Sequence, residues 1–460
     1  MHTHFTAIIV GSGITGMGAA YYLGKKRVPY VILEAKSDLG GVWNCQRWHG
    51  ARCDSDIVKY SFSFKPFLSD QCLHDRADIH AYLYSVAKDF RIMENIRFNT
   101  PVTKAVFDTR KKLWCVHTNQ GMFTARFLFN GNGYFSDQPH VPAFKGAGEF
   151  AGEVVHTTHL DGKRTFADQH VVLVGSGATA ICCAPVLSQV SKSLVLLQRS
   201  PSYIFETDNA VGGFTKLCQH LHRRGLTFPV TLLRHGLQFK DDVIFVAFRQ
   251  FPRVAKWYFQ QHWAKAVGPE MVRQHFSPRY NPWEQRIPVA IGLKEKVRNK
   301  QIRLKTGEID HFTRSGIVLK DGDTLPCDVC VLATGFDLNF LKFDLFIDGQ
   351  RVSIDRINFY KGIMMGGIPN YFQPVGVWHS AWTQRSESVT RFALKVIDYM
   401  GARGLEMVTV ARKPVPIFPS ITPNYITRHP EIPRLYGSFE LPSLDAIFSY
   451  RFSPRQFQFS

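Results

Sequence analysis

With 460 residues, the chain is too long for one compact core and has room for two or three domains with a large site between them. Its composition, 45% hydrophobic and 20% charged, is that of a globular protein, and no apolar run approaches the roughly 18 residues that span a bilayer. The net charge of +19 is unusual, but charge alone does not choose among nucleic acid, anionic lipid and phosphorylated cofactors.

The basic residues are scattered, and the chain has no helix-turn-helix, zinc-finger or RNA-recognition signature. We therefore expect no nucleic-acid partner. The first strand-like run begins at Ala7, too early to follow a cleavable signal, and the nine cysteines are an odd number without regular spacing. These features predict a cytoplasmic protein with free thiols.

The N-terminal third alternates strand, glycine-rich turn and helix. We predict an apolar strand at residues 5–10 (FTAIIV), a turn at 11–16 (GSGITG), the start of a helix at 17–23 and the next strand at 30–34. This order is typical of a βαβ unit.

The same order occurs a second time. A strand at residues 170–174 (HVVLV) leads into a turn at 175–180 (GSGATA), then a helix to about residue 189 and a strand at 193–198. The chain therefore contains two βαβ units about 160 residues apart.

Between residues 205 and 280 the pattern becomes long, aromatic and basic, with apolar positions at helical spacing that Pro252 interrupts. These positions are Ile244, Phe248, Phe251, Ala255, Phe259 and Trp263. We predict an inserted helical subdomain. A strand pair at 316–318 and 329–333 then closes the second unit, and after Asn339 the chain returns to complete the first.

These elements predict an α/β fold of two Rossmann-like dinucleotide-binding domains, with the second domain inserted into the first. We assign residues 1–145 to the first part of the first domain and residues 146–337 to the second domain, which includes the helical insertion at about 205–280. Residues 338–460 form the second part of the first domain.

The first glycine turn has the residues that a dinucleotide pyrophosphate needs. Gly11 makes the tight turn, Gly13 lets the backbone approach the phosphates, and Gly16 lets the helix pack on the strand. The phosphates then lie at the helix N-terminus. Glu34, at the end of the second strand, is placed to accept hydrogen bonds from a ribose, so this unit suits FAD.

The second unit differs at the position equivalent to Glu34, where Arg199 and Ser200 stand instead. A ribose hydroxyl prefers a carboxylate, whereas a 2′-phosphate prefers a cation and hydroxyl donors. We therefore predict NADPH rather than NADH as the second cofactor. Ala180 replaces the third glycine, a change that helix packing tolerates.

Three further stretches bear on what the flavin does. Residues 40–54 (GGVWNCQRWHGARCD) follow the first unit, residues 150–161 (FAGEVVHTTHLD) precede the second, and residues 332–337 (LATGFD) end a strand. With these motifs the chain resembles the type I Baeyer–Villiger monooxygenases, and within them the ethionamide-activating monooxygenase group. The stretches at 275–286 and 360–370 resemble the same group, so the likeness covers nearly the whole chain.

The matched positions can be stated residue by residue. In the family pattern FxGxxxHxxxW followed by Pro or Asp, the matches are Phe150, Gly152, His156 and Asp161, while Leu160 replaces the tryptophan. In the pattern GGxWxxxxYPGxxxD, the matches are Gly40, Gly41, Trp43, Gly50 and Asp54, while Trp48 and His49 replace Tyr and Pro.

The resemblance implies that Arg286 is the catalytic arginine over the flavin and that Asp54 orients it. A fixed guanidinium stabilises the anionic oxygen species from which oxygen is transferred. Family members often carry Lys before this arginine; here Gln285 stands there, so Arg199 and Ser200 take more of the 2′-phosphate recognition.

The motifs and the resemblance together predict one set of cofactor-binding residues. For FAD and the flavin side these are Gly11, Gly13, Thr15, Gly16, Glu34, Gly41, Val42, Trp43, Asn44, Arg52, Cys53, Asp54, Val102, Thr334 and Gly335. For NADPH they are Gly175, Ser176, Gly177, Ala178, Thr179, Ala180, Arg199 and Ser200. We predict no metal site.

The predicted reaction uses NADPH to reduce FAD, and the reduced flavin then uses dioxygen to oxygenate a small lipophilic substrate. A ketone would give an ester or lactone; a thioether, thioamide or amine would give an S- or N-oxide. One alternative is a flavin disulfide reductase, but Cys45 and Cys53 are spaced unlike its cysteine pair. Another is a basic membrane-surface or nucleic-acid-binding protein with vestigial nucleotide folds.

Three further assignments complete the sequence interpretation. We interpret Cys327 and Cys330 as packing residues despite their CxxC spacing, and His156 as a residue that couples the domains. The basic aromatic segment 244–265 has two interpretations: an amphipathic core helix with a solvated basic face, or a peripheral membrane contact.

Overall fold

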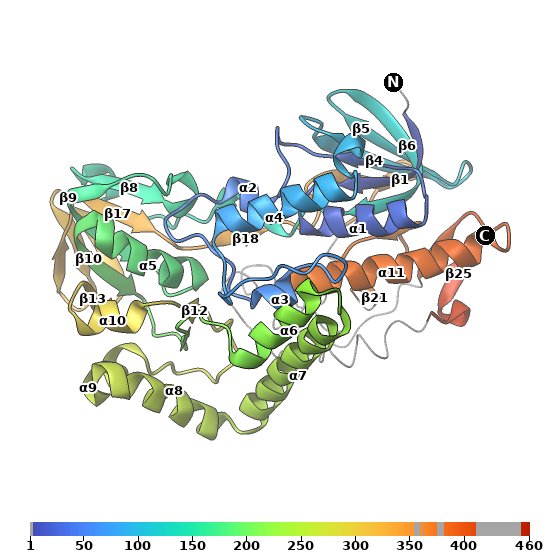
Figure 1. Ribbon diagram of the computed structural model, residues 1–460. Helices are drawn as coiled ribbons and strands as arrows, with labels where there is room; N and C mark the ends of the chain where they lie inside the picture. Colours follow the sequence, from blue (N-terminus) through green and yellow to red (C-terminus); the bar gives the residue numbers. More distant parts are fainter. Residues whose placement is uncertain (1–2, 354–358, 361, 375–380, 411–451) are drawn as a thin grey trace.

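The computed structural model describes residues 3–353, 359–360, 362–374, 381–410 and 452–460. Two α/β units occupy opposite ends of the molecule, and a row of helices runs along its lower edge (Figure 1).

The first sheet is built around the first βαβ unit. Strand β1 (His4–Val10) pairs in parallel with β2 (Tyr30–Leu33) and with β6 (Gly121–Asn130). The residues of β1 from Ala7 to Val10 are all buried, which explains the continuous apolar run. Helix α1 (Ile14–Lys25) follows the glycine turn as predicted.

The C-terminal part of the chain returns to this sheet. Strand β19 (Asp344–Ile347) pairs in parallel with β4 (Val102–Asp108), and β23 (Tyr371–Phe372) pairs with β6. Helix α11 (Trp382–Gly401) packs against α1. The remaining strands of the sheet are β3 (Ile96–Arg97), β5 (Leu113–Thr118) and β20 (Gln350–Arg351).

The second sheet is entirely parallel. Its order is β13-β10-β9-β17-β8, with β9 at the centre. The strands are β8 (Glu153–His156), β9 (Phe166–Val174), β10 (Ser191–Gln198), β13 (Ile302–Thr306) and β17 (Val329–Leu332). Helix α5 (Ala178–Val190) connects β9 to β10, so the second βαβ unit also forms as predicted.

The two strands predicted at 316–318 and 329–333 both form, but they do not pair with each other as predicted. Strand β15 (Gly316–Leu319) forms an antiparallel sheet with β14 (Ile309–Thr313) and β16 (Thr324–Pro326), whereas β17 lies between β8 and β9. Tight turns on either side of β15 direct it into local hairpins, while the fully buried β17 joins the parallel sheet.

The predicted helical insertion consists of α6 (Gly213–Arg223), α7 (Phe228–Gln250), α8 (Pro252–Val267) and α9 (Pro269–His275). The interruption falls where the sequence places it, since Pro252 is the first residue of α8 and lacks only an N–H that no helical bond would use.

The division of the chain at residues 145 and 337 stays a prediction, which the two separate sheets support. Within the third segment, residues 411–451 lie outside the described residues. Further elements are α2 (Val42–Cys45), α3 (Ile57–Tyr60), α4 (Arg76–Asp89), α10 (Leu293–Arg298), β7 (Phe135–Pro139), β11 (Phe205–Glu206), β12 (Val289–Ala290) and β18 (Phe336–Leu338).

Candidate active site

A cavity of about 1670 Å³ lies where the two α/β units face each other. Val10, Leu33 and Asn130 reach it from the carboxyl ends of β1, β2 and β6, and Val174 and Ala333 reach it from the second sheet. Open parallel sheets bind ligands at this edge because the strands end there and the following helices begin. The cavity therefore lies at the ligand-binding edge of both sheets.

Most of the predicted site residues line this cavity. Those on the wall are Gly11, Gly13, Thr15, Glu34, Gly41, Val42, Trp43, Arg52, Cys53, Asp54, Val102, Gly175, Ser176, Gly177, Ala178, Thr179, Arg199, Ser200, Arg286, Thr334 and Gly335. Gly16, Asn44 and Ala180 do not line it. All three are buried: Gly16 and Ala180 bring helices against strands and so face the protein interior, and the Asn44 amide donates to the Asp38 carbonyl (3.3 Å).

The first glycine turn is held by close backbone contacts. Gly11 has φ +90° and donates its N–H to the Leu33 carbonyl (2.9 Å), and a Cβ on Gly16 would lie 1.9 Å from the Gly11 carbonyl oxygen. No acidic residue stands in the first turn of α1 or of α5. The N-cap residues of both helices, Gly13 and Gly177, line the cavity. An anionic group can therefore bind at either helix N-terminus without repulsion from a nearby carboxylate.

The Glu34 carboxylate braces this turn. Its Oε2 accepts from the N–H (2.7 Å) and the hydroxyl (2.6 Å) of Ser12, and its Oε1 accepts from the Lys36 N–H (2.9 Å). A carboxylate has about four acceptor positions, and the chain uses three. Glu34 thus fixes the loop and keeps one position for a ribose hydroxyl.

Arg52 gives an independent test of whether an anionic cofactor fits. Its side chain lines the cavity, and its Nε and one terminal nitrogen are buried without a hydrogen-bond partner among the described residues. A buried, unpaired guanidinium nitrogen is costly, so a partner of negative charge is expected there. The residues fit a dinucleotide such as FAD.

Arg286 and Asp54 form an ion pair inside the cavity. Asp54 comes from the first unit and Arg286 from the loop after α9, and the Asp54 side chain is the more buried of the two, with 16% exposed against 39%. Two phenols lie nearby, the buried Tyr60 and the half-buried Tyr134, and desolvation raises the pKa of both. Tyr60 is fixed by a hydrogen bond from Trp43 Nε1 (2.8 Å). Beside the two protonated phenols, Arg286 is the hydrogen-bond donor that carries a positive charge.

The cysteines do not form a redox pair in the described residues. Cys45 is exposed, Cys53 is buried, and both are free. Burial raises the pKa of the Cys53 thiol, so it stays protonated and is a poor nucleophile. Cys327 and Cys330 are also buried and free, in the core between β17 and the β14–β16 sheet, which agrees with a packing role.

Two of the departures from the family pattern are buried, His49 and Leu160. His49 Nε2 donates to the Arg164 carbonyl (2.6 Å), and Leu160 is buried in the core of the second unit. A Cβ on Gly50 would lie 2.4 Å from the Cys182 carbonyl oxygen, so this loop packs tightly on α5. Trp48, the third departure, lines the cavity.

His156 is the last residue of β8 and lies beside Phe336 of β18. Its Nδ1 accepts from the Thr158 N–H (3.2 Å), and its ring packs edge-on against Phe336 (centroids 6.0 Å apart). Its ring also contacts the backbone of Gly335, so it joins two segments of the chain, and its role in coupling the domains stays a prediction. Burial lowers its pKa to about 4, so the ring is neutral at physiological pH.

Sequence reasoning missed several residues of the cavity wall. Asn130 and Tyr134 flank a Gly-Asn-Gly run at the end of β6, and this glycine-rich end of an apolar strand was a usable signal. Ile244 from α7 and Trp382 from α11 also line the cavity, but nothing local in the sequence distinguishes them.

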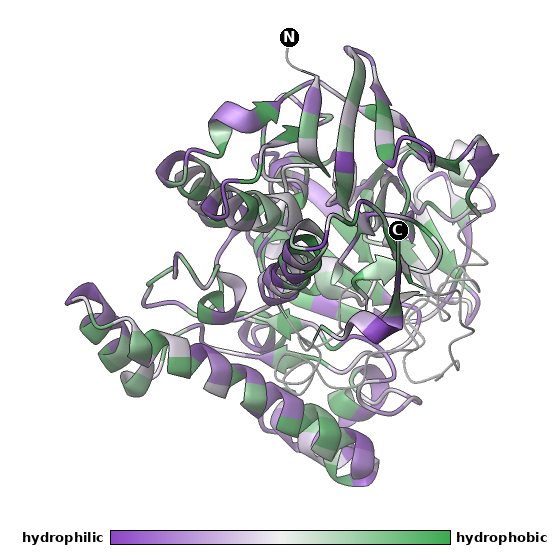
Figure 2. Ribbon diagram, turned by 90° about the vertical axis from the view of Figure 1, so that its right-hand side faces the viewer, coloured by the Kyte–Doolittle hydropathy of each residue, from purple (hydrophilic) through white to green (hydrophobic). Residues whose placement is uncertain are grey.

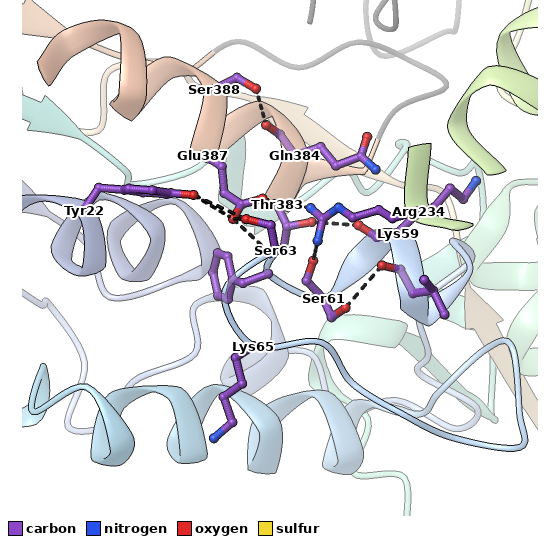
Figure 3. A network of polar contacts seen from close by, with 12 residues as sticks. Tyr22, Lys59, Ser61, Ser63, Lys65, Arg234, Thr383, Gln384, Glu387 and Ser388 are labelled. Carbon is purple, nitrogen blue, oxygen red and sulfur yellow. Dashed lines mark hydrogen bonds and ion pairs between the residues drawn. The ribbon is translucent and has the colours of Figure 1, made fainter. Parts of the chain in front are cut away.

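A buried polar network fastens α7 to the wall of the first unit (Figure 3). Arg234 donates to Glu387 Oε2 (2.8 Å) and to the Ser61 carbonyl. Glu387 Oε1 also accepts from the Ser63 N–H (2.9 Å) and from the Tyr22 hydroxyl (3.2 Å). The network joins α1, the loop after α3, α7 and α11 in one place.

The fold and the cavity define an oxidoreductase with two dinucleotide-binding units. The pyridine nucleotide-disulphide oxidoreductase family model matches residues 8–210. The chain is 33% identical over 446 residues to the FAD-containing monooxygenase EthA of Mycobacterium tuberculosis, covering 93% of this chain and 90% of that protein. It belongs to the family of FAD-containing monooxygenases, which confirms the predicted flavin monooxygenase and its FAD cofactor.

Two solved structures have the same fold. A steroid monooxygenase bound to NADP matches with a TM-score of 0.76 and 24% identity, covering 89% of this chain and 88% of that one. Cyclohexanone monooxygenase matches with a TM-score of 0.77 and 20% identity over all of both chains. These matches confirm the predicted fold of two Rossmann-like domains.

Proposed function

We propose that the protein is an NADPH-dependent monooxygenase that inserts one oxygen atom from dioxygen into a small lipophilic ketone, giving an ester or a lactone. The observation that carries this proposal is the Arg286–Asp54 ion pair, which combines residues from both units within one cavity. The FAD chemistry of the family and the NADP bound in the similar steroid monooxygenase support the cofactor pair.

Each of the two helix N-termini binds one cofactor. The α1 turn, Glu34 and Arg52 hold FAD, which when bound supplies the redox chemistry. The α5 turn holds the pyrophosphate of NADPH, and Arg199 binds its 2′-phosphate.

Arg286 stabilises negative charge that develops on oxygen during transfer to the substrate. Asp54 keeps the guanidinium in the cavity and limits its rotation. Because Tyr60 and Tyr134 keep their protons at neutral pH, Arg286 supplies the positive charge at this point.

The substrate class follows from the rest of the wall, which is rich in large apolar side chains. These are Trp43, Trp48, Phe205, Ile244, Trp283, Phe336, Phe343 and Trp382. Such a wall favours a substrate with a hydrocarbon body and few polar groups. S- or N-oxygenation remains the alternative, because Trp48 alters the wall where the ketone-oxidising family carries Tyr.

The proposal is tested by an NADPH-consumption screen over ketones, thioethers and amines with products identified by mass spectrometry, followed by the same assay on Arg286→Ala. We expect FAD to be retained and oxygenation to fall about 100- to 1000-fold, the usual effect of removing one donor to a transition-state charge. Flavin reduction by NADPH is measured separately by stopped flow.

Arg279→Ala is the matched control, because Arg279 is an exposed arginine of the same loop that does not line the cavity. It should leave product formation unchanged. Near-normal product formation by Arg286→Ala would show that the assignment of Arg286 is wrong, and exclusive formation of S- or N-oxides would favour the alternative reaction.

A further inference from the structure

The outer surface of α6–α8 is unusually apolar. Twelve of the sixteen exposed large hydrophobic side chains in the described residues lie between residues 214 and 258. Scattered exposed apolar residues are ordinary, but a concentration of this kind marks an interaction surface. Figure 1 places these helices along the lower edge of the molecule, and Figure 2 shows hydrophobic and hydrophilic segments side by side on the helices of that edge.

On α7 the exposed apolar residues form one stripe. Phe228, Leu232, Phe239, Val243 and Val246 are spaced by four, seven, four and three residues, which puts them on one face of a helix. Phe228 is 72% exposed and Phe239 62% exposed. These side chains therefore form a continuous apolar ridge on the outside of the insertion.

Helix α8 continues the pattern, with two apolar faces. The stripe Ala255, Phe259 and Trp263 packs inward, as an amphipathic core helix would. Val254 and Trp257, however, are 59% and 60% exposed on another face. A helix that needed only a core-facing stripe would carry polar residues at these positions.

The charge of this surface has one sign. Residues 213–267, all of which the structure describes, contain nine Lys and Arg but only two carboxylates, Asp241 and Asp242. Asp242 is buried and Asp241 is paired with Lys59, so the exposed surface of the three helices has no unpaired carboxylate. Arg249 and Arg253 are exposed beside the apolar residues.

We propose that this outer face of α6–α8 docks on an anionic phospholipid bilayer. Exposed aromatic and aliphatic side chains with basic residues beside them are what an interfacial helix presents to such a membrane. No helix in the described ranges is long and apolar enough to cross a membrane, so the contact is with the surface.

The docking face lies across α7 from the cavity. Lys240, Asp241 and Ile244 line the cavity from the side of α7 opposite the Phe239 and Val246 stripe. A lipophilic substrate dissolved in the bilayer would therefore reach the site over a short path beside this helix. This step rests on the proposed function, whereas membrane docking does not.

The test is flotation of the FAD-loaded protein with vesicles of phosphatidylcholine, alone or with about 30% phosphatidylglycerol, at about 50 mM and 500 mM NaCl. We expect flotation with the anionic vesicles at low salt. Phe239→Gln/Trp257→Gln should lower the apparent affinity at least about tenfold at both salt concentrations. Arg249→Gln/Arg253→Gln should lower it about fivefold per residue at low salt and much less at high salt.

The matched control variants remove exposed apolar or basic side chains that lie outside α6–α8. Met122→Gln removes an exposed apolar side chain from β6, and Lys25→Gln/Lys192→Gln removes two exposed charges. Absence of flotation, or flotation that the α7–α8 variants leave unchanged, would overturn the proposal. So would analytical ultracentrifugation that shows a dimer dissociated by Phe239→Gln/Trp257→Gln, because a second copy would then cover this face.

Measuring ketone oxidation with and without vesicles distinguishes the membrane-docking proposal from the proposed function. A short, water-soluble ketone assayed without vesicles should be oxidised equally by the parent protein and by Phe239→Gln/Trp257→Gln. A long-chain ketone carried in anionic vesicles should be oxidised more slowly by the variant. Flotation without any ketone oxidation would refute the proposed function alone; ketone oxidation without flotation would refute docking alone.

Discussion

The Arg234–Glu387 ion pair allows a quantitative test of how the helical insertion is fastened to the cavity wall. Both side chains are buried, with 7% and 1% exposed. Removing one partner of a buried pair costs about 3–5 kcal/mol, because the other charge is left uncompensated. For Arg234→Met we expect about 3 kcal/mol, the lower end, since Ser63 and Tyr22 still donate to the carboxylate.

The double variant Arg234→Met/Glu387→Gln should be less destabilised than the sum of its single variants by about 2 kcal/mol, because it leaves no unpaired charge. Unfolding in urea is followed by circular dichroism and by flavin release. Since α7 contributes Ile244 to the cavity wall, Arg234→Met should also raise KM for the ketone.

The control is Lys26→Met, which breaks an ion pair with Asp398 that joins α1 to α11 at half-exposed positions. It should cost under about 1 kcal/mol. The reasoning fails if Arg234→Met costs no more than this control, or if the losses of the two single variants simply add.

Arg199→Ala should lower kcat/KM for NADPH about tenfold to a hundredfold, since a hydrogen bond to a charged group is worth about 1.5–3 kcal/mol, and it should leave kcat/KM for NADH unchanged. Equal losses for both cofactors would disprove a 2′-phosphate contact. Gly16→Ala should purify without the 450 nm flavin absorbance, because its Cβ would lie 1.9 Å from the Gly11 carbonyl oxygen. Burial lowers the pKa of His156 to about 4, so the free energy of unfolding should fall as the pH falls from 6.5 to about 4. His156→Gln should reduce the slope of the free energy of unfolding against pH in that range. An unchanged slope would contradict this prediction.

The local parts of this protein follow from its sequence. The two strand–turn–helix units appear where period and glycine spacing predict them, because a buried strand and a tight turn are encoded in adjacent residues. The predicted site is likewise brought to one cavity, apart from Gly16, Asn44 and Ala180, which are buried.

Contacts between distant segments needed the tertiary structure. Asp54 and Arg286 meet across 232 positions of sequence, and only a family resemblance pointed to their pairing. The apolar runs of β15 and β17 look alike in sequence, yet they enter different sheets.

The helical insertion shows the physical reason most clearly. Of the apolar positions that periodicity identified, Ala255, Phe259 and Trp263 are buried, but Phe251 is 61% exposed. It did not reveal that Phe239 and Trp257 would stay exposed, because a sequence records how hydrophobic a residue is and not what packs against it. Burial is a property of the neighbours, and only the assembled fold supplies them.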